Sequence, residues 1–323
     1  MQAIEVDRFG DPDVLVMRTV PEPQPAQGQV LIDVHAAAVV YGDVIVRSGR
    51  RPTPTPLPWI PGIEVGGVVV AAGPGVDRSL VGRAVVATTA GQQGGYAELA
   101  VAPAASTFPV PDGLALEVAL TVFQAGALAR GMLAAMGLRA DDTVLVTAAA
   151  GWIGSMLVQA AKAAGATVIG VASTGKSGAV KEFGADHVLD YGDGWADRVR
   201  ELTGGRGVSL ALDAVGGEIG AAAVAALADG RGRIGVYGFA SGAWTPVDVA
   251  TIVRRGLVLA SPLGTVLRKP DAELRVDGEE ALAAAARGEL TPRIHARFPL
   301  VRAADAHREL ESRSSVGAIV LTR

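Results

Sequence analysis

Hydrophobic and polar positions follow two different patterns along the chain. In residues 1–110, short runs rich in β-branched residues are separated by segments rich in Pro and Gly, a pattern typical of a β-domain with short strands. The expected strands are Val14–Val20, Val30–Ala38, Glu64–Ala71, Ala84–Thr88 and Tyr96–Val101. From about residue 116 to residue 264, helix and strand patterns alternate, which predicts a parallel sheet with helices on its faces.

One segment of the second region predicts a complete βαβ unit. Thr143–Ala148 and Ala166–Ala172 are apolar enough for buried strands, and Ser155–Ala164 carries helix formers. The turn before this helix has small residues in A-x-G-x-x-G spacing: Ala149, Gly151 and Gly154. Small residues let the backbone approach a pyrophosphate, and the helix start offers free N–H groups to it. This context predicts a dinucleotide site; a tight turn without a ligand is the alternative.

The end of the second strand indicates which dinucleotide binds. NAD-binding units usually carry Asp or Glu there for the ribose 2′-hydroxyl. Here the strand is followed by Ser173 and Lys176, with no acid between them. Because hydroxyl and ammonium groups hold a 2′-phosphate that a carboxylate would repel, we expect NADP(H). The alternative is that Lys176 is an ordinary solvated lysine.

The flanking segments suggest how the two regions are connected. Leu116–Met136 is expected to be a helix that is apolar on most faces, and Asp271–Arg287 an amphipathic helix. Phe298 opens a return to β-type segments, which end with a helix at Ala303–Ser312 and a strand at Gly317–Leu321. We therefore expect the nucleotide domain to be inserted into a discontinuous β-domain.

Composition excludes several classes of function. The 323 residues carry a net charge of −4 without a basic stripe, so nucleic acid is an unexpected partner. There is no cysteine, which excludes disulfides, thiolate metal ligands and a cysteine nucleophile. The first residues lack the apolar core of a signal peptide, and a glycine turn interrupts the uncharged stretch Thr143–Ala161. We expect a soluble, cytoplasmic protein that does not enter a membrane.

With these residues in view, the chain resembles the zinc-independent quinone oxidoreductases of the medium-chain dehydrogenase/reductase superfamily. The resemblance spans nearly the whole length and rests on PGIEVGGVVVAAGPGV, GGYAELAVAP, TAAAGWIGS, GADHVLDY, LDAVGG and LESRSSVGAIVL. It implies an α/β fold in which a Rossmann doubly wound parallel sheet is inserted into a β-rich GroES-like catalytic domain. The implied divisions are a catalytic domain at 1–117, an NADP-binding domain at 118–264 and a return to the catalytic domain at 265–323. It also implies a homodimer.

The residues at the family's metal position predict no metal. Ile63 occupies the place where zinc-bearing relatives have a His, and the loop 91–95 is too short for a structural zinc lobe. The four histidines show no paired ligand spacing and are expected to be structural or surface residues: His35, His187, His295 and His307.

The resemblance also implies individual cofactor contacts. In the turn, Trp152 and Ile153 replace the usual Gly and Val of the family. The adenosine 2′-phosphate and ribose are served by Ser173, Lys176, Tyr191 and Arg313. Gly238 and Phe239 border the nicotinamide side. Tyr191 as a strand cap and Arg313 as a solvated charge are the alternatives.

Three polar positions around the implied nicotinamide pocket depart from the family pattern: Val40, Arg51 and Ala127. One explanation is drift in a tolerant pocket; the other is a different substrate. Arginines at Arg47, Arg50 and Arg51 would suit an anionic group better than a neutral quinone.

The expected chemistry is transfer of hydride from NADPH to a quinone or an α,β-unsaturated carbonyl. The negative charge that develops on oxygen calls for a hydrogen-bond donor, for which Tyr41 comes first and Gln124 second. Tyr41 could equally pack as a pocket wall, and Asp43 is expected to be an orienting acceptor rather than a base. The alternative functions are an enoyl-thioester reductase, with arginines on a phosphate-bearing carrier, and an NADPH-binding sensor or scaffold with little turnover.

Overall fold

The computed structural model describes residues 1–51, 53 and 55–323. The chain forms two compact units: Met1–Gln124 with Gly278–Arg323, and Ala125–Asp277. Their divisions fall inside two helices, α2 (Leu116–Ala135) and α9 (Asp271–Ala286). The sequence-based boundaries, 117/118 and 264/265, lie 7 and 13 residues before these divisions, 124/125 and 277/278.

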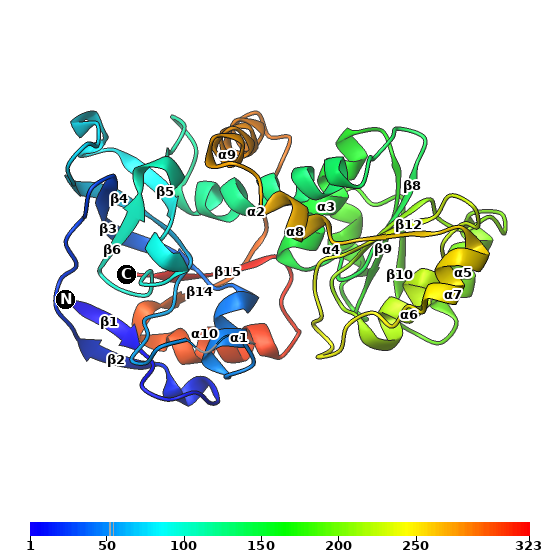
Figure 1. The fold of residues 1–323 in the computed structure, drawn as a ribbon, viewed down its shortest axis with the longest axis horizontal. Coiled ribbons are helices and arrows are strands. Elements are labelled where there is room, and N and C mark those ends of the chain that lie inside the picture. The colour runs from blue at the N-terminus through cyan, green and yellow to red at the C-terminus, as the bar shows by residue number, and fades with distance from the viewer. Residues whose placement is uncertain (52, 54) are drawn as a thin grey trace. The chain divides into compact units, whose positions relative to one another are not determined.

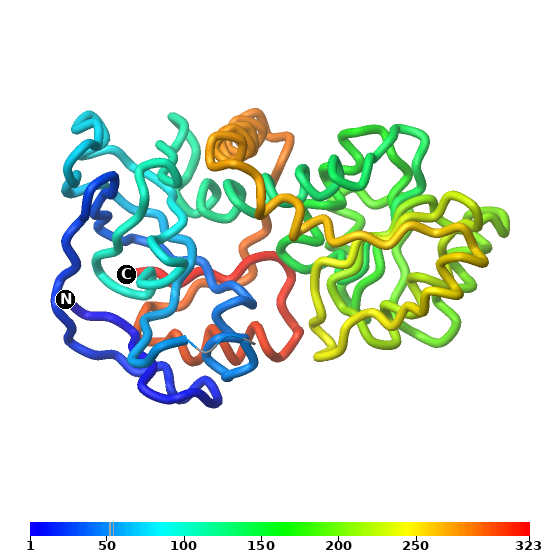
Figure 2. The backbone as a smooth tube through the Cα atoms, viewed as in Figure 1, coloured from blue at the N-terminus to red at the C-terminus, as the bar shows by residue number. Residues whose placement is uncertain are grey.

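The first unit is a β-domain built from two separated segments of the chain. Its main sheet has the strand order β14-β15-β3-β4-β5-β7, with β6 paired to β3, and β1 and β2 form a separate hairpin. Figure 2 shows the red C-terminal segment returning among the blue and cyan strands. The bounds are β1 Gln2–Glu5, β2 Val16–Thr19, β3 Gln29–Ala38, α1 Tyr41–Arg47, β4 Glu64–Ala72, β5 Ala84–Thr88, β6 Leu99–Pro103, β7 Thr107–Pro109, β14 Ile294–Pro299, α10 Ala303–Glu311 and β15 Ala318–Thr322.

Alternating inward positions of these strands build one apolar core. On β3, Val30, Ile32 and Val34 are buried, and they join Val65 and Val69 of β4 in the same cluster. The C-terminal segment contributes inward-facing residues of α10 and β15 to that core. The β-domain therefore cannot be completed until the last residues of the chain return to it.

The second unit contains six strands that all pair in parallel, in the order β10-β9-β8-β11-β12-β13. This is the Rossmann order, so the predicted fold class is confirmed. Figure 1 shows its helices packed around the sheet. The bounds are β8 Thr143–Val146, α3 Trp152–Ala163, β9 Thr167–Ala172, α4 Ser177–Glu182, β10 His187–Asp190, α5 Trp195–Leu202, β11 Leu210–Asp213, α6 Gly217–Ala225, β12 Arg233–Val236, α7 Val249–Arg255, β13 Val258–Ala260 and α8 Pro262–Val266.

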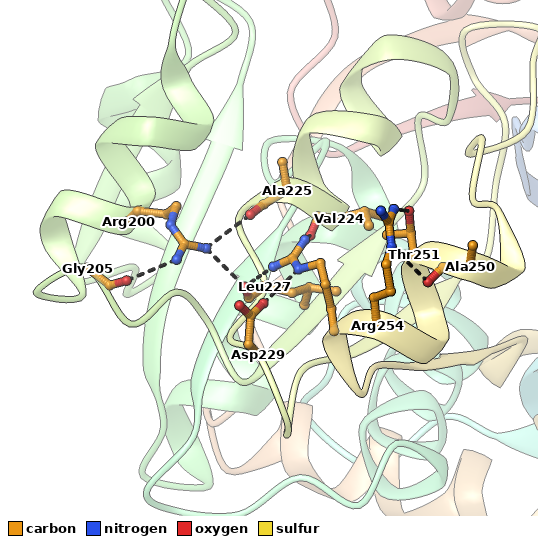
Figure 3. Close-up of polar contacts among 10 residues, drawn as sticks. Arg200, Gly205, Val224, Ala225, Leu227, Asp229, Ala250, Thr251 and Arg254 are labelled. Carbon is orange, nitrogen blue, oxygen red and sulfur yellow. Dashed lines mark hydrogen bonds and ion pairs between the residues drawn. The ribbon is translucent and has the colours of Figure 1, made fainter.

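The C-terminal end of α6 is closed by two arginines (Figure 3). Arg200 donates to the carbonyl oxygens of Ala225 and Leu227, and Arg255 donates to those of Val224 and Leu227. Cations at this end satisfy carbonyls that the helix leaves open and complement its dipole. These guanidinium groups therefore have a structural role, although they lie near a surface cavity of about 420 Å³ that Arg200 helps to line.

Among the described residues, α2 is the one helix long and apolar enough to cross a membrane, with a mean hydropathy of 1.4. However, 61 % of its apolar window is buried inside the protein. A helix whose apolar faces are covered by protein needs no lipid, so its length and composition are weak evidence for a membrane span.

Candidate functional site

The predicted nucleotide turn joins β8 to α3 at the carboxyl edge of the parallel sheet. Ala148 takes a left-handed conformation with φ of 48°, and Gly151 is the N-cap of α3. A Cβ atom on Gly154 would lie 2.1 Å from the carbonyl oxygen of Ala148, so only glycine fits there. The turn thus has the close backbone packing that a pyrophosphate cradle needs, at the start of a helix whose N-terminal dipole favours an anion.

The helix begins earlier than the sequence pattern predicts. Trp152 and Ile153 already belong to α3, where both are half-buried, whereas the pattern placed the helix start at Ser155. Glycine and β-branched residues are weak helix formers, but packing of the turn overrides that preference. The first turn of α3 therefore lies directly beside the small residues of the turn, among which Ala149 is buried.

Tyr191, which directly follows β10, fixes the shape of this turn. Its hydroxyl oxygen accepts from the Ala148 N–H at 2.6 Å, and the hydroxyl donates to the Val171 carbonyl oxygen at 3.2 Å. Burial raises the pKa of this phenol, so the hydroxyl keeps its proton. Tyr191 is therefore a positioning residue for the turn, and its contact with the ribose or phosphate stays a prediction.

A buried carboxylate organises the point where the strand order reverses, between β8 and β11. Asp213, which ends β11, accepts from the hydroxyls of Thr147 and Thr245 at 2.7 and 2.5 Å. It also accepts from the backbone N–H groups of Val215 and Gly216 at 3.0 and 3.1 Å. Such switch points are where open α/β sheets bind ligands. In the sequence, Asp213 is the Asp of LDAVGG, and its place directly after an apolar run is the signal that could have identified it.

The end of β12 carries a phenol that the sequence analysis passed over. The buried hydroxyl oxygen of Tyr237 has no hydrogen-bond partner in the described part of the chain. Burial first, and then the charge of Asp213, raise its pKa. Next to it, Gly238 packs against the Ala214 backbone, and the ring of Phe239 lies 4.4 Å from that of Trp244. This edge therefore presents apolar surface and one unused hydroxyl.

The residues expected at the 2′-phosphate lie on both units. Ser173 is exposed directly after β9, Gly175 turns the chain with φ of 87°, and Lys176 caps α4. No acid lies in this loop, so its charge fits a phosphate. Arg313 is exposed on the first unit, with φ of 60°, and its contact with the same phosphate stays a prediction.

A cavity of about 260 Å³ lies within the first unit beside α1. Arg51, Asp43 and Ile63 line it, together with apolar side chains. The other two predicted catalytic residues do not line this cavity: Tyr41 begins α1 beneath the Arg50 guanidinium, and the Gln124 amide oxygen accepts from the Thr88 hydroxyl at 3.3 Å. Whether these residues share a site with Arg51 stays a prediction.

The expectation that Arg47 serves an anionic ligand is wrong. Its side chain is 1 % exposed and makes two hydrogen bonds to Glu311, at 2.8 and 2.9 Å. This pair joins α1 to α10, which lie side by side in Figure 1. A guanidinium buried this deeply needs a carboxylate partner, and a pattern of adjacent arginines does not reveal it.

Titratable groups cluster in the core behind the cavity. Burial raises the pKa of Asp43 to about 7, against the opposing Gly62 N–H, and burial with the Asp43 charge raises the pKa of Glu64 to about 8. The Tyr96 hydroxyl lies 3.2 Å from His307 Nε2, and burial with the Arg47 charge lowers the pKa of His307 to about 3. One carboxylate oxygen of Asp43 and one of Glu64 have no hydrogen-bond partner within the described residues.

No three His, Asp or Glu side chains come together as a possible metal site in residues 1–51, 53 and 55–323. Ile63 contributes an aliphatic side chain where zinc-bearing relatives were expected to have a ligand.

Comparisons with known proteins cover both units. Residues 26–112 match the family described as alcohol dehydrogenase GroES-like domain, and residues 153–275 match the family described as zinc-binding dehydrogenase. The chain is 34 % identical over 323 residues to a quinone oxidoreductase of Pseudomonas aeruginosa, with 98 % of each chain covered.

Two further similarities bear on chemistry. The chain is 32 % identical over 336 residues to a 2-haloacrylate reductase of a Burkholderia species, covering 99 % of this chain and 98 % of that one. A solved structure of a mycobacterial protein, described as complexed with NADPH, matches with a TM-score of 0.92 at 39 % identity and covers 100 % of both chains.

Proposed function

Because the chain belongs to the quinone oxidoreductase-like family of the medium-chain dehydrogenase/reductase superfamily, we propose that it is an NADPH-dependent oxidoreductase that reduces a quinone or an α,β-unsaturated carbonyl without a metal. The observation that carries this proposal is the turn between β8 and α3, where the Gly154 position admits no side chain. The NADPH complex of the similar mycobacterial protein supports the same cofactor.

The second unit would hold the cofactor along the carboxyl edge of its sheet. The N–H groups at the start of α3 would bind the pyrophosphate, while Ser173 and Lys176 would contact the 2′-phosphate. Tyr191 and Asp213 act behind them: one fixes the turn and the other ties β8 to β11. The proposed cofactor site would thus depend mainly on backbone geometry.

When bound, NADPH supplies a hydride. The chain's own residues would orient the acceptor, exclude water and provide a hydrogen-bond donor at the acceptor oxygen, which receives the electron pair. The Tyr41 hydroxyl and the Gln124 amide are the proposed donors. A proton added to the reduced acceptor completes the two-electron reduction, with NADP⁺ as the other product.

The side chains near Ile63 support chemistry without a metal. The cavity wall there combines an aliphatic side chain with Asp43, whose raised pKa makes it a weak cation ligand at neutral pH. The chain has no cysteine for a thiolate site. Elemental analysis of purified protein should find no stoichiometric zinc, and a chelator should leave turnover unchanged.

The name of the Burkholderia relative favours one acceptor class within the proposal. A 2-haloacrylate is an α,β-unsaturated acid, so the similarity supports a conjugated carbonyl compound beside quinones. An enoyl-thioester reductase and a sensor with little turnover stay as alternatives. A cytoplasmic homodimer also remains part of the proposal.

The decisive experiment mixes purified protein with NADPH and a panel of acceptors. The panel contains 1,4-benzoquinone, small enones and enoyl thioesters, and absorbance at the NADPH band reports turnover. Reduction of quinones or enones supports the proposal. Turnover of enoyl thioesters alone would replace it with the thioester reductase, and NADPH binding without any oxidation would replace it with the sensor.

The cofactor preference can be tested separately. We expect NADPH to bind at least about tenfold more tightly than NADH, equivalent to about 1.4 kcal/mol. Lys176→Ala should weaken NADPH alone, while Lys181→Ala, an exposed lysine on the same helix, should change neither affinity. Equal wild-type affinity for both cofactors would contradict the assignment.

A further inference from the structure

The lining and the volume of the cavity beside α1 indicate what kind of ligand it can hold. Among the described residues, its lining combines apolar side chains with the polar or charged side chains of Asp43, Arg51, Thr55, Gln92 and Gln93, so it offers both apolar surface and hydrogen-bonding groups to a small molecule. The apolar lining residues include Ile45, Val46, Trp59 and Ile63. At about 260 Å³ it is slightly smaller than most ligand pockets, which begin at about 300 Å³, so its occupant has few atoms.

The charges on this wall are unbalanced. Arg51 and Asp43 are the charged residues among the described residues that line it. Arg51 is exposed and makes no ion pair or hydrogen bond within the described part of the chain, whereas Arg47 and Arg50 are engaged with Glu311 and Ser48. Arg51 is therefore the one guanidinium of the three that is available to a ligand.

Asp43 does not neutralise this cation in the way a surface carboxylate would. Its side chain is fully buried, and burial raises its pKa to about 7, so it carries only part of a negative charge at neutral pH. A second unused group lies on the same wall: the Thr55 Oγ1 atom is buried and has no partner within the described residues. A cation and a hydroxyl together match the two oxygens of a carboxylate.

We propose that this cavity selects an acceptor that carries a carboxylate, a small α,β-unsaturated acid, through Arg51 and Thr55. The inference rests on the proposed function and names the substrate class of that activity. Guanidinium binds carboxylate with two parallel hydrogen bonds, which a neutral quinone cannot match. The apolar lining then accommodates the short carbon chain.

The same contact assists the reduction. Hydride from NADPH forms the new bond at the carbon β to the carboxylate, and the electron pair of the double bond moves toward the carboxylate oxygens. A proton then adds to the α carbon, giving the saturated acid and NADP⁺. An arginine on the carboxylate stabilises the added negative charge, so it lowers the barrier as well as binding the substrate.

The test compares 2-chloroacrylate with its methyl ester, which has the same double bond and no charge, and with 1,4-benzoquinone. Wild-type protein should show a kcat/KM for the acid at least about tenfold above that for the ester. Arg51→Ala should reduce kcat/KM for the acid by about 10- to 100-fold and change the ester, the quinone and the NADPH Kd less than about twofold. Arg51→Lys should restore part of the loss.

The matched control is Arg18→Ala, which removes one exposed arginine of the same unit on β2. It should leave all three acceptors unchanged, which separates a local contact from loss of overall charge. Equal kcat/KM for acid and ester, or an acid preference that survives Arg51→Ala, overturns the inference and leaves the proposed function standing. Absence of NADPH oxidation with every acceptor overturns the proposed function and the inference with it.

Discussion

The two units bury carboxylates in opposite ways. In the second unit, Asp213 accepts four hydrogen bonds, two from hydroxyls and two from backbone N–H groups. In the first unit, Asp43 and Glu64 each have an oxygen without a partner within the described residues. Burial raises the pKa of both Asp43 and Glu64, because it penalises the charged form more than their few donors stabilise it.

This difference separates a rigid scaffold from a responsive site. A buried carboxylate with all its donors in place holds strands and turns together, so Asp213 stabilises the carboxyl edge before a cofactor binds. A buried carboxylate that lacks donors gains most from a proton or a ligand. The first unit therefore places its least satisfied groups in and behind the cavity where we propose that the acceptor binds.

The largest loss of stability should come from removing Asp213, the buried carboxylate whose hydrogen bonds are satisfied. Asp213→Ala leaves four buried donors without an acceptor and should lower the free energy of unfolding by about 3–4 kcal/mol. Denaturant titration followed by circular dichroism measures it. The control is Asp190→Ala at the end of β10, where the carboxylate accepts an exposed bond from Gly192 and should cost less than about 1 kcal/mol. Similar losses in both variants would refute the special role of Asp213.

A second change tests the pre-built turn. Gly154→Ala places a methyl group 2.1 Å from the Ala148 carbonyl oxygen, so the turn must open, at about 2–3 kcal/mol of stability and at least about tenfold in NADPH affinity. Calorimetric titration with NADPH gives the affinity. Gly178→Ala is the matched control, because it lies in α4 with no atom near the added Cβ and should stabilise the protein slightly. Unchanged NADPH affinity in the Gly154 variant would show that the turn does not form the site.

Asp43 and Glu64, the buried carboxylates that each have an oxygen without a partner among the described residues, predict that the free energy of unfolding depends on pH. Asp43 and Glu64 keep protons in the folded state up to about pH 7 and 8, whereas their ordinary pKa values are 3.8 and 4.5. The folded state therefore binds more protons over that range, and the free energy of unfolding should fall as pH rises from about 4 to about 8. Asp43→Asn with Glu64→Gln should remove most of this fall, which amounts to several kcal/mol.

Denaturant titrations at several pH values measure this slope for the wild type and the double variant. His307 acts in the opposite direction: its lowered pKa removes stability as pH falls from 6.5 toward 3, so it offsets part of the carboxylate effect between pH 4 and 6.5 and leaves the fall above pH 6.5 unaffected. A double variant as pH-sensitive as the wild type would place the titrating groups elsewhere.

The smallest effects are expected from removing a single tyrosine hydroxyl of the second unit, that of Tyr191 or that of Tyr237. Tyr191→Phe removes the acceptor of the Ala148 N–H and should cost about 1–2 kcal/mol, with a few-fold loss of NADPH affinity. Tyr237→Phe removes a buried hydroxyl that has no partner within the described residues, so it should be neutral or slightly stabilising. Thermal unfolding of the two variants under the same conditions measures the difference, and equal destabilisation would contradict it.

Local patterns predicted much of the architecture because they act over a few residues. Alternation along β3 and the apolar runs of β8 and β9 indicated strands, and the spacing of Gly151 and Gly154 indicated the turn between them. The absence of an acid after β9 indicated the cofactor class. Each of these signals depends on neighbours in the chain, so no knowledge of the rest of the fold was needed.

The tertiary structure alone decided which charged residues are used. Arg47 and Arg51 look equivalent in the sequence, yet one is paired with Glu311, 264 positions away, and the other lines a cavity. The raised pKa values of Asp43 and Glu64 likewise depend on burial in the folded unit, where Tyr96, 53 positions beyond Asp43, is among the partners of Asp43. Desolvation and ion pairing arise from contacts between distant residues, which a one-dimensional pattern does not encode, whereas strand, turn and helix preferences are written in adjacent positions.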